Sequence, residues 1–362
     1  MKALLKNFFR KEESLVSVDI GASGIKLIEL DLSESKPKLI NIAHSPISGE
    51  IFVNNIITKS EKISEQITAL LEGNAVSDKR AVTAMPGPSV FTKKIKMQKA
   101  PPAELASNVQ FEAGNFIPHN IEAVRLDYHV IGDAGKNQLD ILVVAVKNEI
   151  IDSFMTTLSL AGLETAVVDV DHFAVQNMFE LGYPEELSKT VALINMGARY
   201  SSINICKDGK SLFTGDIPVG GKLFTDSLMT ELSVAFDVAE NLKKGKPAKD
   251  IDSNQAQEII DKNIEYVASE FNRQLSFFWN ASGAEEGIDK IALCGGGSLV
   301  TGLLGELSEK TGIECFMVDP LRGISIGEGF DAQFIKEISP LMGICAGMAL
   351  RQPGDRIVVM DD

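Results

Sequence analysis

Several features that mark specialised proteins are scarce in this chain of 362 residues. It has only four cysteines, which lie far apart and form no C-x-x-C pair: Cys206, Cys294, Cys315 and Cys345. That spacing gives little support to a zinc site or a disulfide framework and is typical of reduced cytosolic thiols. No apolar run approaches the roughly 20 residues that span a bilayer. Basic residues number 35 against 50 acidic ones, and this argues against broad nucleic-acid contact, which needs clustered Lys and Arg.

The first eleven residues, MKALLKNFFRK, mix apolar and basic side chains. They lack the long apolar core and the small-residue cleavage site of a signal peptide, so we expect a cytoplasmic protein. On a helix, residues 1–11 could make weak contact with an anionic membrane surface. A terminus that frays, or that docks on a partner, accounts for the same residues equally well, because one or two helical turns bind membrane weakly.

The stretch from Ser14 to Leu32, SLVSVDIGASGIKLIELDL, predicts two strands joined by a tight turn. Asp19 stands at the inner end of the first strand, facing a turn with two glycines, a serine and a lysine: Gly21, Ser23, Gly24 and Lys26. Glycine turns let backbone N–H groups approach phosphate oxygens closely. An acid beside them can hold magnesium through waters while a lysine neutralises phosphate. On this turn alone, a plain hairpin with a solvated lysine is an equally good account.

The same plan recurs later in the chain, which has length enough for about two to three domains. Residues 190–221, TVALINMGARYSSINICKDGKSLFTGDIPVGG, read as strand, glycine turn, strand, Asp208-Gly209 hairpin and strand. Asn195 occupies the place of Asp19, and Gly197 follows it within two residues. Two similar halves facing one another would bring both turns to a single cleft, which favours a nucleotide site.

A third glycine cluster lies near the C-terminus. A buried strand, residues 291–293, leads into Gly295, Gly296, Gly297 and Ser298 and then a predicted helix. The start of such a helix favours an anion or nucleotide, but strand-glycine-helix turns are common, and the chain contains neither a G-x-G-x-x-G fingerprint nor a P-loop. In a helical passage between the turns, Glu240 and Lys243 stand three apart and share a face. Such a pair is usually only a surface ion pair.

Together these motifs resemble the superfamily of actin, heat-shock chaperones and sugar kinases. The resemblance rests on D-x-G-x-S-G-x-K near the start, the repeated turn, IPVGG, A-E-x-x-K and the late GGGS turn, in that order. Within the superfamily the chain is similar to the PilM family of type IV pilus assembly proteins, which is related to FtsA. Residues 111–132, FEAGNFIPHNIEAVRLDYHVIG, carry this closer similarity, with DIPVGGKLFT and MGICAGMALR.

The resemblance implies an α/β, actin-like fold, a duplicated ribonuclease H-like arrangement with two insertions. Its first actin-like subdomain would comprise residues 12–92, 166–188 and 340–351, and an inserted small α/β subdomain residues 93–165. The second actin-like subdomain would comprise residues 189–221 and 289–338, with a helical insertion at residues 222–288.

The resemblance also implies that the chain binds ATP or ADP with Mg2+. Asp19 would hold the magnesium through water, and Gly21, Ser23, Gly24 and Lys26 would cradle the phosphates. Asn195, Gly197 and Gly221 would lie on the other side of the phosphates, although a purely structural turn explains Gly221 as well. Glu240 and Lys243 would reach the ribose and adenine, and Gly295, Gly296, Gly297 and Ser298 would close over the nucleoside.

One residue departs from the pattern of active ATPases. Many actin-like ATPases have an aspartate where this chain has Asn195, and that acid helps to position magnesium and the attacking water. Asn keeps a carbonyl acceptor but loses the charge, so we expect hydrolysis to be slow at most. Asp169 and Asp171 are weak candidates for a water-orienting acid, and a helix N-cap explains either residue equally well.

As a member of this family, the chain is expected to be a cytoplasmic scaffold, peripheral at the inner membrane, that acts with other pilus platform proteins. Its partner would be the N-terminal cytoplasmic peptide of a PilN-like inner-membrane protein, captured in a groove between the first and inserted subdomains. Phe111, Phe116, Ile117 and Pro118 are the candidate contacts. The alternatives are an active ATPase or small-molecule kinase of the same fold, or a filament-forming protein like FtsA.

Overall fold

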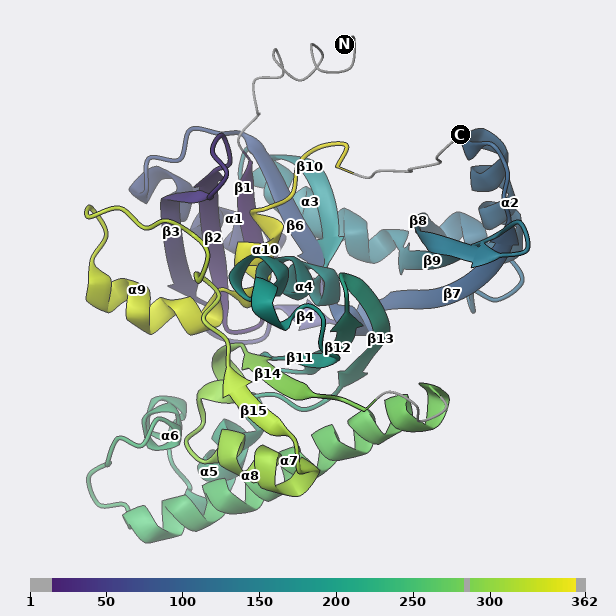
Figure 1. Ribbon diagram of the computed structural model, residues 1–362. Helices are drawn as coiled ribbons and strands as arrows, with labels where there is room; N and C mark the ends of the chain where they lie inside the picture. The colour runs from purple at the N-terminus through teal and green to yellow at the C-terminus, as the bar shows by residue number, and fades with distance from the viewer. Residues whose placement is uncertain (1–14, 283–286, 356–362) are drawn as a thin grey trace.

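The computed structural model describes residues 15–282 and 287–355, and Figure 1 shows two β-sheets, one above the other, with helices between and around them. The expected membrane contact of residues 1–11 lies outside the described residues. Within them, no helix combines the length and the apolar character that a membrane span requires.

The two sheets have the same plan. The first has the order β10-β6-β1-β2-β3 and consists of β1 (Val16–Ile20), β2 (Gly24–Asp31), β3 (Lys38–Pro46), β6 (Arg80–Met85) and β10 (Glu164–Val170). The second has the order β13-β12-β11-β14-β15 and consists of β11 (Val191–Met196), β12 (Ser201–Lys207), β13 (Lys210–Ile217), β14 (Lys290–Cys294) and β15 (Glu314–Met317). In each sheet three antiparallel strands come first in the chain and two parallel strands follow. The repeat predicted from the sequence is therefore confirmed.

Helices cover the outer face of each sheet. Against the first sheet pack α1 (Ser60–Gly73) and α3 (Asn148–Leu160), whose apolar side chains meet those of Val16 and Val18. Against the second pack α5 (Lys222–Leu232), α6 (Phe236–Lys243), α7 (Ser253–Ser282) and α8 (Leu303–Thr311). Periodic apolar stripes on these helices bury the outer sheet faces, as expected for amphipathic helices.

A middle layer joins the two sheets. It consists of α4 (Asp171–Gly182) and α10 (Gly343–Met348), which lie between the sheets in Figure 1. One apolar cluster contains residues of both sheets and both helices, among them Ile28, Val175, Leu193 and Ala346. The helix α9 (Ala332–Ile338) packs its partly buried Ile335 at the edge of the same cluster.

A small unit projects from the first half and lies at the right of Figure 1. It has three antiparallel strands in the order β7-β9-β8, namely β7 (Val90–Gln98), β9 (Gln138–Lys147) and β8 (Val124–Gly135), and one helix, α2 (Pro102–Ala113). Leu105 and Val109 of α2 pack on Ile141 and Val143 of the central strand. The short hairpin β4 (Phe52–Val53) and β5 (Ile56–Ile57) belongs to the first half.

Candidate functional site

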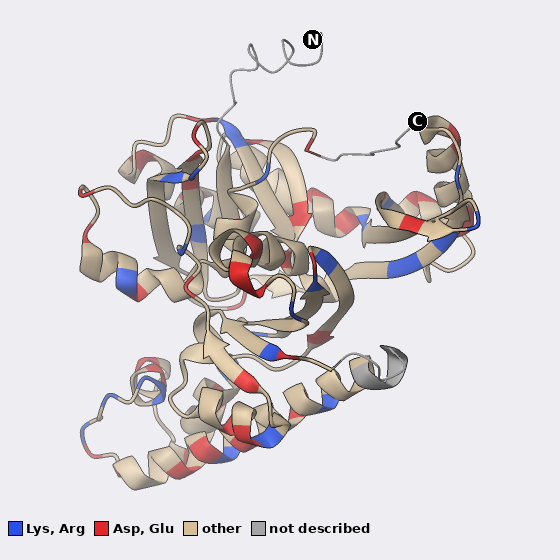
Figure 2. Cartoon of the chain, viewed as in Figure 1, with Lys and Arg blue, Asp and Glu red and all other residues tan. Residues whose placement is uncertain are grey.

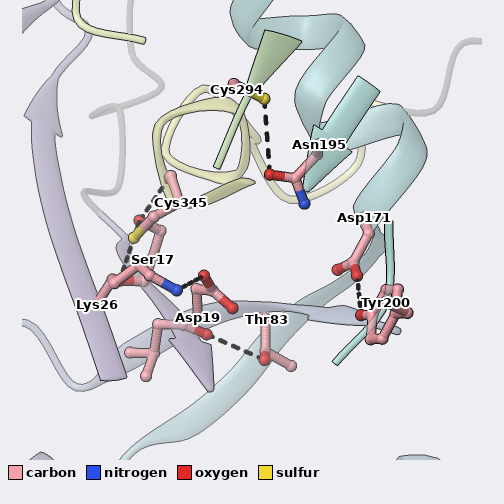
Figure 3. A network of polar contacts seen from close by, with 10 residues as sticks. Ser17, Asp19, Lys26, Thr83, Asp171, Asn195, Tyr200, Cys294 and Cys345 are labelled. Atoms are coloured by element: carbon pink, nitrogen blue, oxygen red, sulfur yellow. Dashed lines mark hydrogen bonds and ion pairs between the residues drawn. The ribbon is translucent and has the colours of Figure 1, made fainter. Parts of the chain in front are cut away.

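Strand alternation directs the polar candidates toward the middle layer. Val16 and Val18 of β1 face α1 and α3, so Asp19, the residue after Val18, faces the other way. In β11, Ala192 and Ile194 face the outer helices, and Asn195 therefore also points toward the middle. The repeat thus places Asp19 and Asn195 on facing sides of one space, and Figure 3 shows both side chains directed into it.

The first turn holds a buried ion pair. Asp19 and Lys26 are direct partners in the β1–β2 register, and Lys26 Nζ lies 2.7 Å from Asp19 Oδ2. Burial alone would lower the pKa of Lys26, but the Asp19 carboxylate outweighs it, so the pKa lies above its usual value and the lysine is charged. The Gly21 N–H donates to the Gly24 carbonyl at 3.0 Å. The predicted tight turn is present, and its lysine is paired rather than solvated.

The second turn begins where β11 ends. Its Gly197 N–H donates to the Tyr200 carbonyl at 3.0 Å, and the Gly197 carbonyl accepts from Gly221 N–H at 2.9 Å, so the turn is fastened to the start of α5. Asn195 is 7% exposed, and its Oδ1 accepts from the Cys294 thiol at 3.6 Å. The first turn pairs its acid with a lysine, whereas Ser202 stands opposite Asn195. The second turn therefore has no counterpart of the Asp19–Lys26 ion pair at these two positions.

The third turn packs directly on the second. A Cβ at Gly295, whose φ is +88°, would lie 2.5 Å from the Met196 carbonyl, and one at Gly297 would lie 2.8 Å from the Gly197 carbonyl. These contacts require glycine at both positions. Ser298 is buried and its hydroxyl donates to the Gly295 carbonyl at 2.6 Å. The helix predicted after the glycines is present as α8, which begins at Leu303 and contains Leu307, and a short 3-10 turn, Gly296–Leu299, precedes it.

Glu240 and Lys243 of α6 lie beside this glycine cluster. They form an ion pair with each other. The Thr225 hydroxyl donates to Glu240 at 2.5 Å, and Lys243 Nζ donates to Thr225 Oγ1 at 3.0 Å and to the Gly221 carbonyl at 3.4 Å. Burial would raise the pKa of Glu240, but its bonds to Lys243 and Thr225 outweigh burial and lower it. Glu240 is therefore ionised, and the pair is tied to the start of α5.

The two aspartates considered as water-orienting acids have different surroundings. Asp169 pairs with Arg351, whose Nη1 lies 3.2 Å from Asp169 Oδ2, and it also accepts from the Val170 N–H. Asp171 is the first residue of α4 and makes no capping bond. Its Oδ2 accepts from the Tyr200 hydroxyl at 2.5 Å. The N-cap explanation is therefore wrong for Asp171.

Asp171 is a buried acid in an unfavourable environment. It is 4% exposed. Burial first, and then the negative charge of Asp19, raise its pKa to about 7, although the bond from Tyr200 acts in the opposite direction. Figure 3 shows one Asp171 oxygen bonded to Tyr200 and the other directed into the space that Asp19 and Asn195 also face. Perturbed acids in such positions are typical of functional sites.

The candidate partner residues do not share one surface. Phe111 is 75% exposed on α2, and together with Phe116 it lines a groove of about 480 Å3 between α2 and β7. Phe116 stacks on Phe91, and Lys93 Nζ lies 4.3 Å from its ring centre. Ile117 is only 7% exposed, within the core of the small unit, so it would support rather than touch a peptide. Pro118 is exposed.

This α2/β7 groove is lined entirely by residues of the small unit, between Lys93 and Gln138, and the first five-stranded sheet and its helices contribute none of the lining. A second groove, of about 540 Å3, lies on the other side of α2 and is lined from Ala106 and Gln110 to Asp127 and Tyr128. Figure 2 shows basic residues along β7, in a chain whose net charge is −15.

Two residues of the site were given no role in the sequence analysis. Tyr200 meets Asp171 from a turn in the other half of the molecule, and Thr225 joins Glu240 and Lys243 from a neighbouring helix. Tyr200 lies within the repeated strand-turn segment and Thr225 ends the DIPVGGKLFT segment, but neither segment indicated these contacts. The fold alone brings them to their partners.

Comparison with solved structures places this fold among actin-like proteins. The chain is similar to one in a PilM-PilN type IV pilus biogenesis complex, with 25% identity over 93% of this chain and 98% of that one and a TM-score of 0.82. The ethanolamine utilization protein EutJ from Carboxydothermus hydrogenoformans matches with 17% identity over 93% and 89% of the two chains and a TM-score of 0.54.

MreB 5 of Spiroplasma citri, in a structure bound to AMPPNP, matches with 12% identity over 92% of this chain and 94% of that one and a TM-score of 0.50. The similarity to EutJ and MreB 5 concerns the α/β, actin-like fold alone. The family model described as type IV pilus assembly protein PilM matches residues 17–353. The chain therefore belongs to the PilM family of actin-like, type IV pilus assembly proteins.

Proposed function

We propose that this protein is a nucleotide-bound scaffold of the type IV pilus platform that captures the cytoplasmic tail of a PilN-like inner-membrane protein. One observation supports this above all. The similarity to the chain of the PilM-PilN complex extends over 93% of this chain and 98% of that one. The protein would stay in the cytoplasm, peripheral at the inner membrane, and act with other platform proteins.

The residues at the three turns fit ATP or ADP with Mg2+. Two buried carboxylates, Asp19 and Asp171, face one charged lysine, Lys26, so the site has an excess of negative charge when both acids are ionised. The described residues contain no group of three or more His, Cys, Asp or Glu side chains that could hold a metal. We infer that magnesium would be held through water at Asp19 and through the nucleotide phosphates.

The glycine turns would supply the remaining contacts of the nucleotide. Gly21, Ser23, Gly24 and Lys26 would receive the phosphates from the first half, and Asn195, Gly197 and Gly221 would face them from the second half. Gly295, Gly296, Gly297 and Ser298 would border the nucleoside. Glu240 and Lys243, which are hydrogen-bonded to Thr225 and lie beside Gly221, would reach the ribose and adenine.

Turnover would be slow because Asn195 brings no charge to the site. Asp171 is the better of the two candidate water-orienting acids, since Asp169 is held by Arg351. With a pKa of about 7, Asp171 would be only half ionised at neutral pH. A scaffold needs the nucleotide to stabilise one conformation rather than to be consumed rapidly. An active ATPase or kinase and an FtsA-like filament are therefore the weaker alternatives.

The small unit is the proposed capture site. Phe111 offers a large exposed ring beside Phe116 in the α2/β7 groove. An apolar side chain of a peptide can pack against such a ring. We propose that residues 93–165 form a subdomain inserted into the first actin-like subdomain (residues 12–92, 166–188 and 340–351). The second actin-like subdomain would be residues 189–221 and 289–338, interrupted by the helical insertion at residues 222–288.

The test uses a fluorescent peptide with the N-terminal cytoplasmic sequence of the PilN protein from the same bacterium. We expect Phe111→Ala to weaken binding of this peptide at least tenfold, measured by anisotropy. The matched control is Phe277→Ala, because Phe277 is a similarly exposed ring on α7, where no contact is proposed. Equal binding by both variants and the wild type would reject the α2/β7 groove. Failure of the wild-type protein to bind the peptide would reject the capture function.

A further inference from the structure

Asp171 depends on a single side chain of the second half for its orientation. Its Oδ2 accepts from the Tyr200 hydroxyl at 2.5 Å, and the other oxygen points toward the space between Asp19 and Asn195. A carboxylate rotates about its terminal torsion with little resistance, so one hydrogen bond to one oxygen decides where the other oxygen points.

Tyr200 is itself rigidly held. Its carbonyl accepts from Gly197 N–H at 3.0 Å, which closes the second turn. The neighbouring carbonyls of Gly197 and Ala198 accept from Gly221 and Lys222 N–H at 2.9 Å each, at the start of α5. The turn proposed to contact phosphate therefore ends in the residue that holds Asp171. Any displacement of this turn moves the hydroxyl, and with it the Asp171 oxygen.

We propose that Tyr200 is a positioning residue that fixes Asp171 toward the bound phosphate and couples the second glycine turn to the start of α4. This inference rests on the proposed function. It concerns a residue that acts through another, since the Tyr200 hydroxyl donates to Asp171.

The electrostatics agree with this role. Burial, followed by the charge of Asp171, raises the pKa of Tyr200 well above its usual value, so the phenol stays protonated and donates. The groups that act on Asp171 come from four elements: Asp19 and Lys26 from β1 and β2, His172 from α4, and Asp216 from β13, besides Tyr200 itself. Of these, Tyr200 is the neutral hydrogen-bond donor, and its loss would leave the Asp171 anion buried beside Asp19 without that bond.

Tyr200→Phe tests the proposal because it keeps the ring and removes only the hydroxyl. The first readout is the carboxyl titration of Asp171, followed by NMR on protein labelled with 13C at aspartate, in the absence of nucleotide. Asp171→Asn identifies the signal. We expect the pKa of Asp171 to rise by about one unit in Tyr200→Phe, the size typical of losing a strong hydrogen bond to a carboxylate. An unchanged titration would overturn the proposal.

The second readout is the affinity for Mg-ATP, measured by calorimetry. We expect Tyr200→Phe to weaken binding roughly tenfold and Tyr200→Phe in the Asp171→Asn background to change it little. The matched control is Tyr183→Phe, which removes another buried tyrosine hydroxyl, one that accepts from Asp319 N–H away from this space. An equal loss in the control, or an undiminished loss without Asp171, would show a merely structural role.

The two readouts separate this proposal from the proposed function. If the wild-type protein binds no Mg-ATP, the nucleotide-bound scaffold is rejected, and the inference that rests on it is rejected too. If the wild-type protein binds Mg-ATP while Tyr200→Phe shifts the titration but not the affinity, the proposed function stands and only the positioning role is overturned.

Discussion

At the scale of single residues, the site is a set of buried charges that oppose stability. Asp19 and Lys26 offset each other across one strand pair, whereas Asp171 has one neutral donor and an acidic neighbour. A buried charge is costly unless it is paired and hydrogen-bonded. Such groups are retained at functional sites, where their cost is offset elsewhere in the fold.

Removing Lys26 should expose that cost. We expect Lys26→Met to lower the free energy of unfolding by about 3 kcal/mol, because it leaves Asp19 buried without its cation. The double variant Asp19→Asn, Lys26→Met should recover part of this loss. Urea denaturation measures both effects. If Lys26→Met alone is as stable as the wild type, the Asp19–Lys26 pair is well solvated.

Asp171 should give the protein a characteristic pH dependence. Its pKa is about 7 in the folded state and near 4 in an unfolded chain. Between these values the folded protein keeps a proton that the unfolded chain releases, so the Asp171 contribution to stability falls as the pH rises from about 4 to 7 and then levels off. We therefore expect Asp171→Asn to flatten this part of the stability profile and to be the more stable protein at pH 8. Urea denaturation from pH 5 to 8 measures this. If the free energy of unfolding depends on pH in the same way in the wild type and in Asp171→Asn, the raised pKa does not belong to Asp171.

Asn195 should limit turnover. We expect Asn195→Asp to raise the rate of phosphate release at least tenfold, because the added charge helps to orient magnesium and water. Asn263→Asp adds a carboxylate at another buried asparagine, on α7, and serves as the control. If the two variants release phosphate at the same rate as the wild type, the charge at residue 195 is not what limits hydrolysis.

The sequence predicts contacts between residues that are close along the chain better than contacts between distant ones. The pairing of Asp19 with Lys26 follows from a short turn, because the register of a tight hairpin is local. The bond of Tyr200 to Asp171 depends on how two sheets and α4 are stacked, and no local pattern encodes that stacking. Asp171 itself was a candidate with two explanations, of which the structure excludes the N-cap, because Val170 is the cap residue of α4, while the water-orienting role stays a proposal.

At the scale of elements, β13 ties the small unit to the second half. The Thr92 and Thr214 hydroxyls hydrogen-bond at 3.0 Å, and Lys94 Nζ donates to the carbonyls of Ser211 and Leu212. Nearby, His172 Nε2 at the start of α4 lies 3.3 Å from Asp216 of β13. We call the contacts of Thr92 and Lys94 with Ser211, Leu212 and Thr214 the β7–β13 seam. Movement of the second half relative to the first must therefore displace β7 or break this seam.

This seam predicts coupling between nucleotide and peptide. We expect Lys94→Ala combined with Thr214→Val to bind Mg-ATP and the PilN tail separately as the wild type does, while the effect of Mg-ATP on peptide affinity falls toward onefold. Calorimetry of the peptide with and without Mg-ATP measures this effect. Coupling of wild-type size in the double variant would show that the β7–β13 contacts do not transmit it.

Element types followed from the sequence more readily than their ends and contacts. The recurring Val, Ile and Leu residues of β1, β2 and β11 predicted buried strands, because branched apolar side chains favour a strand. The sequence predicted the helix that contains Leu303 but not the 3-10 turn before it, because that turn depends on the close approach of Gly295 and Gly297 to the second turn. The β7–β13 seam joins residues more than a hundred positions apart and has no local signature.

At the scale of the whole molecule, the protein has two pseudo-equivalent halves, a middle layer that carries Asp171, and one projecting unit. Its net charge of −15 keeps copies of the chain apart and disfavours nucleic acid. Family membership, with the structural likeness to the chain of the PilM-PilN complex, favours a scaffold over a filament or a dedicated enzyme.

A capture scaffold needs no polymer. We expect the protein to remain in the supernatant when it is centrifuged at high speed with Mg-ATP, at both low and physiological salt, because its negative charge opposes close packing of copies. Mg-ADP serves as the matched condition. Pelleting that depends on Mg-ATP would favour the FtsA-like alternative.

The central claim is that a nucleotide-bound form of this protein captures the PilN tail, and titration calorimetry of the wild-type protein with the tail peptide tests it most directly. We predict saturable binding of one peptide per chain, with an affinity that Mg-ATP changes at least fivefold, about 1 kcal/mol of coupling. Absence of peptide binding both with and without Mg-ATP would contradict the account.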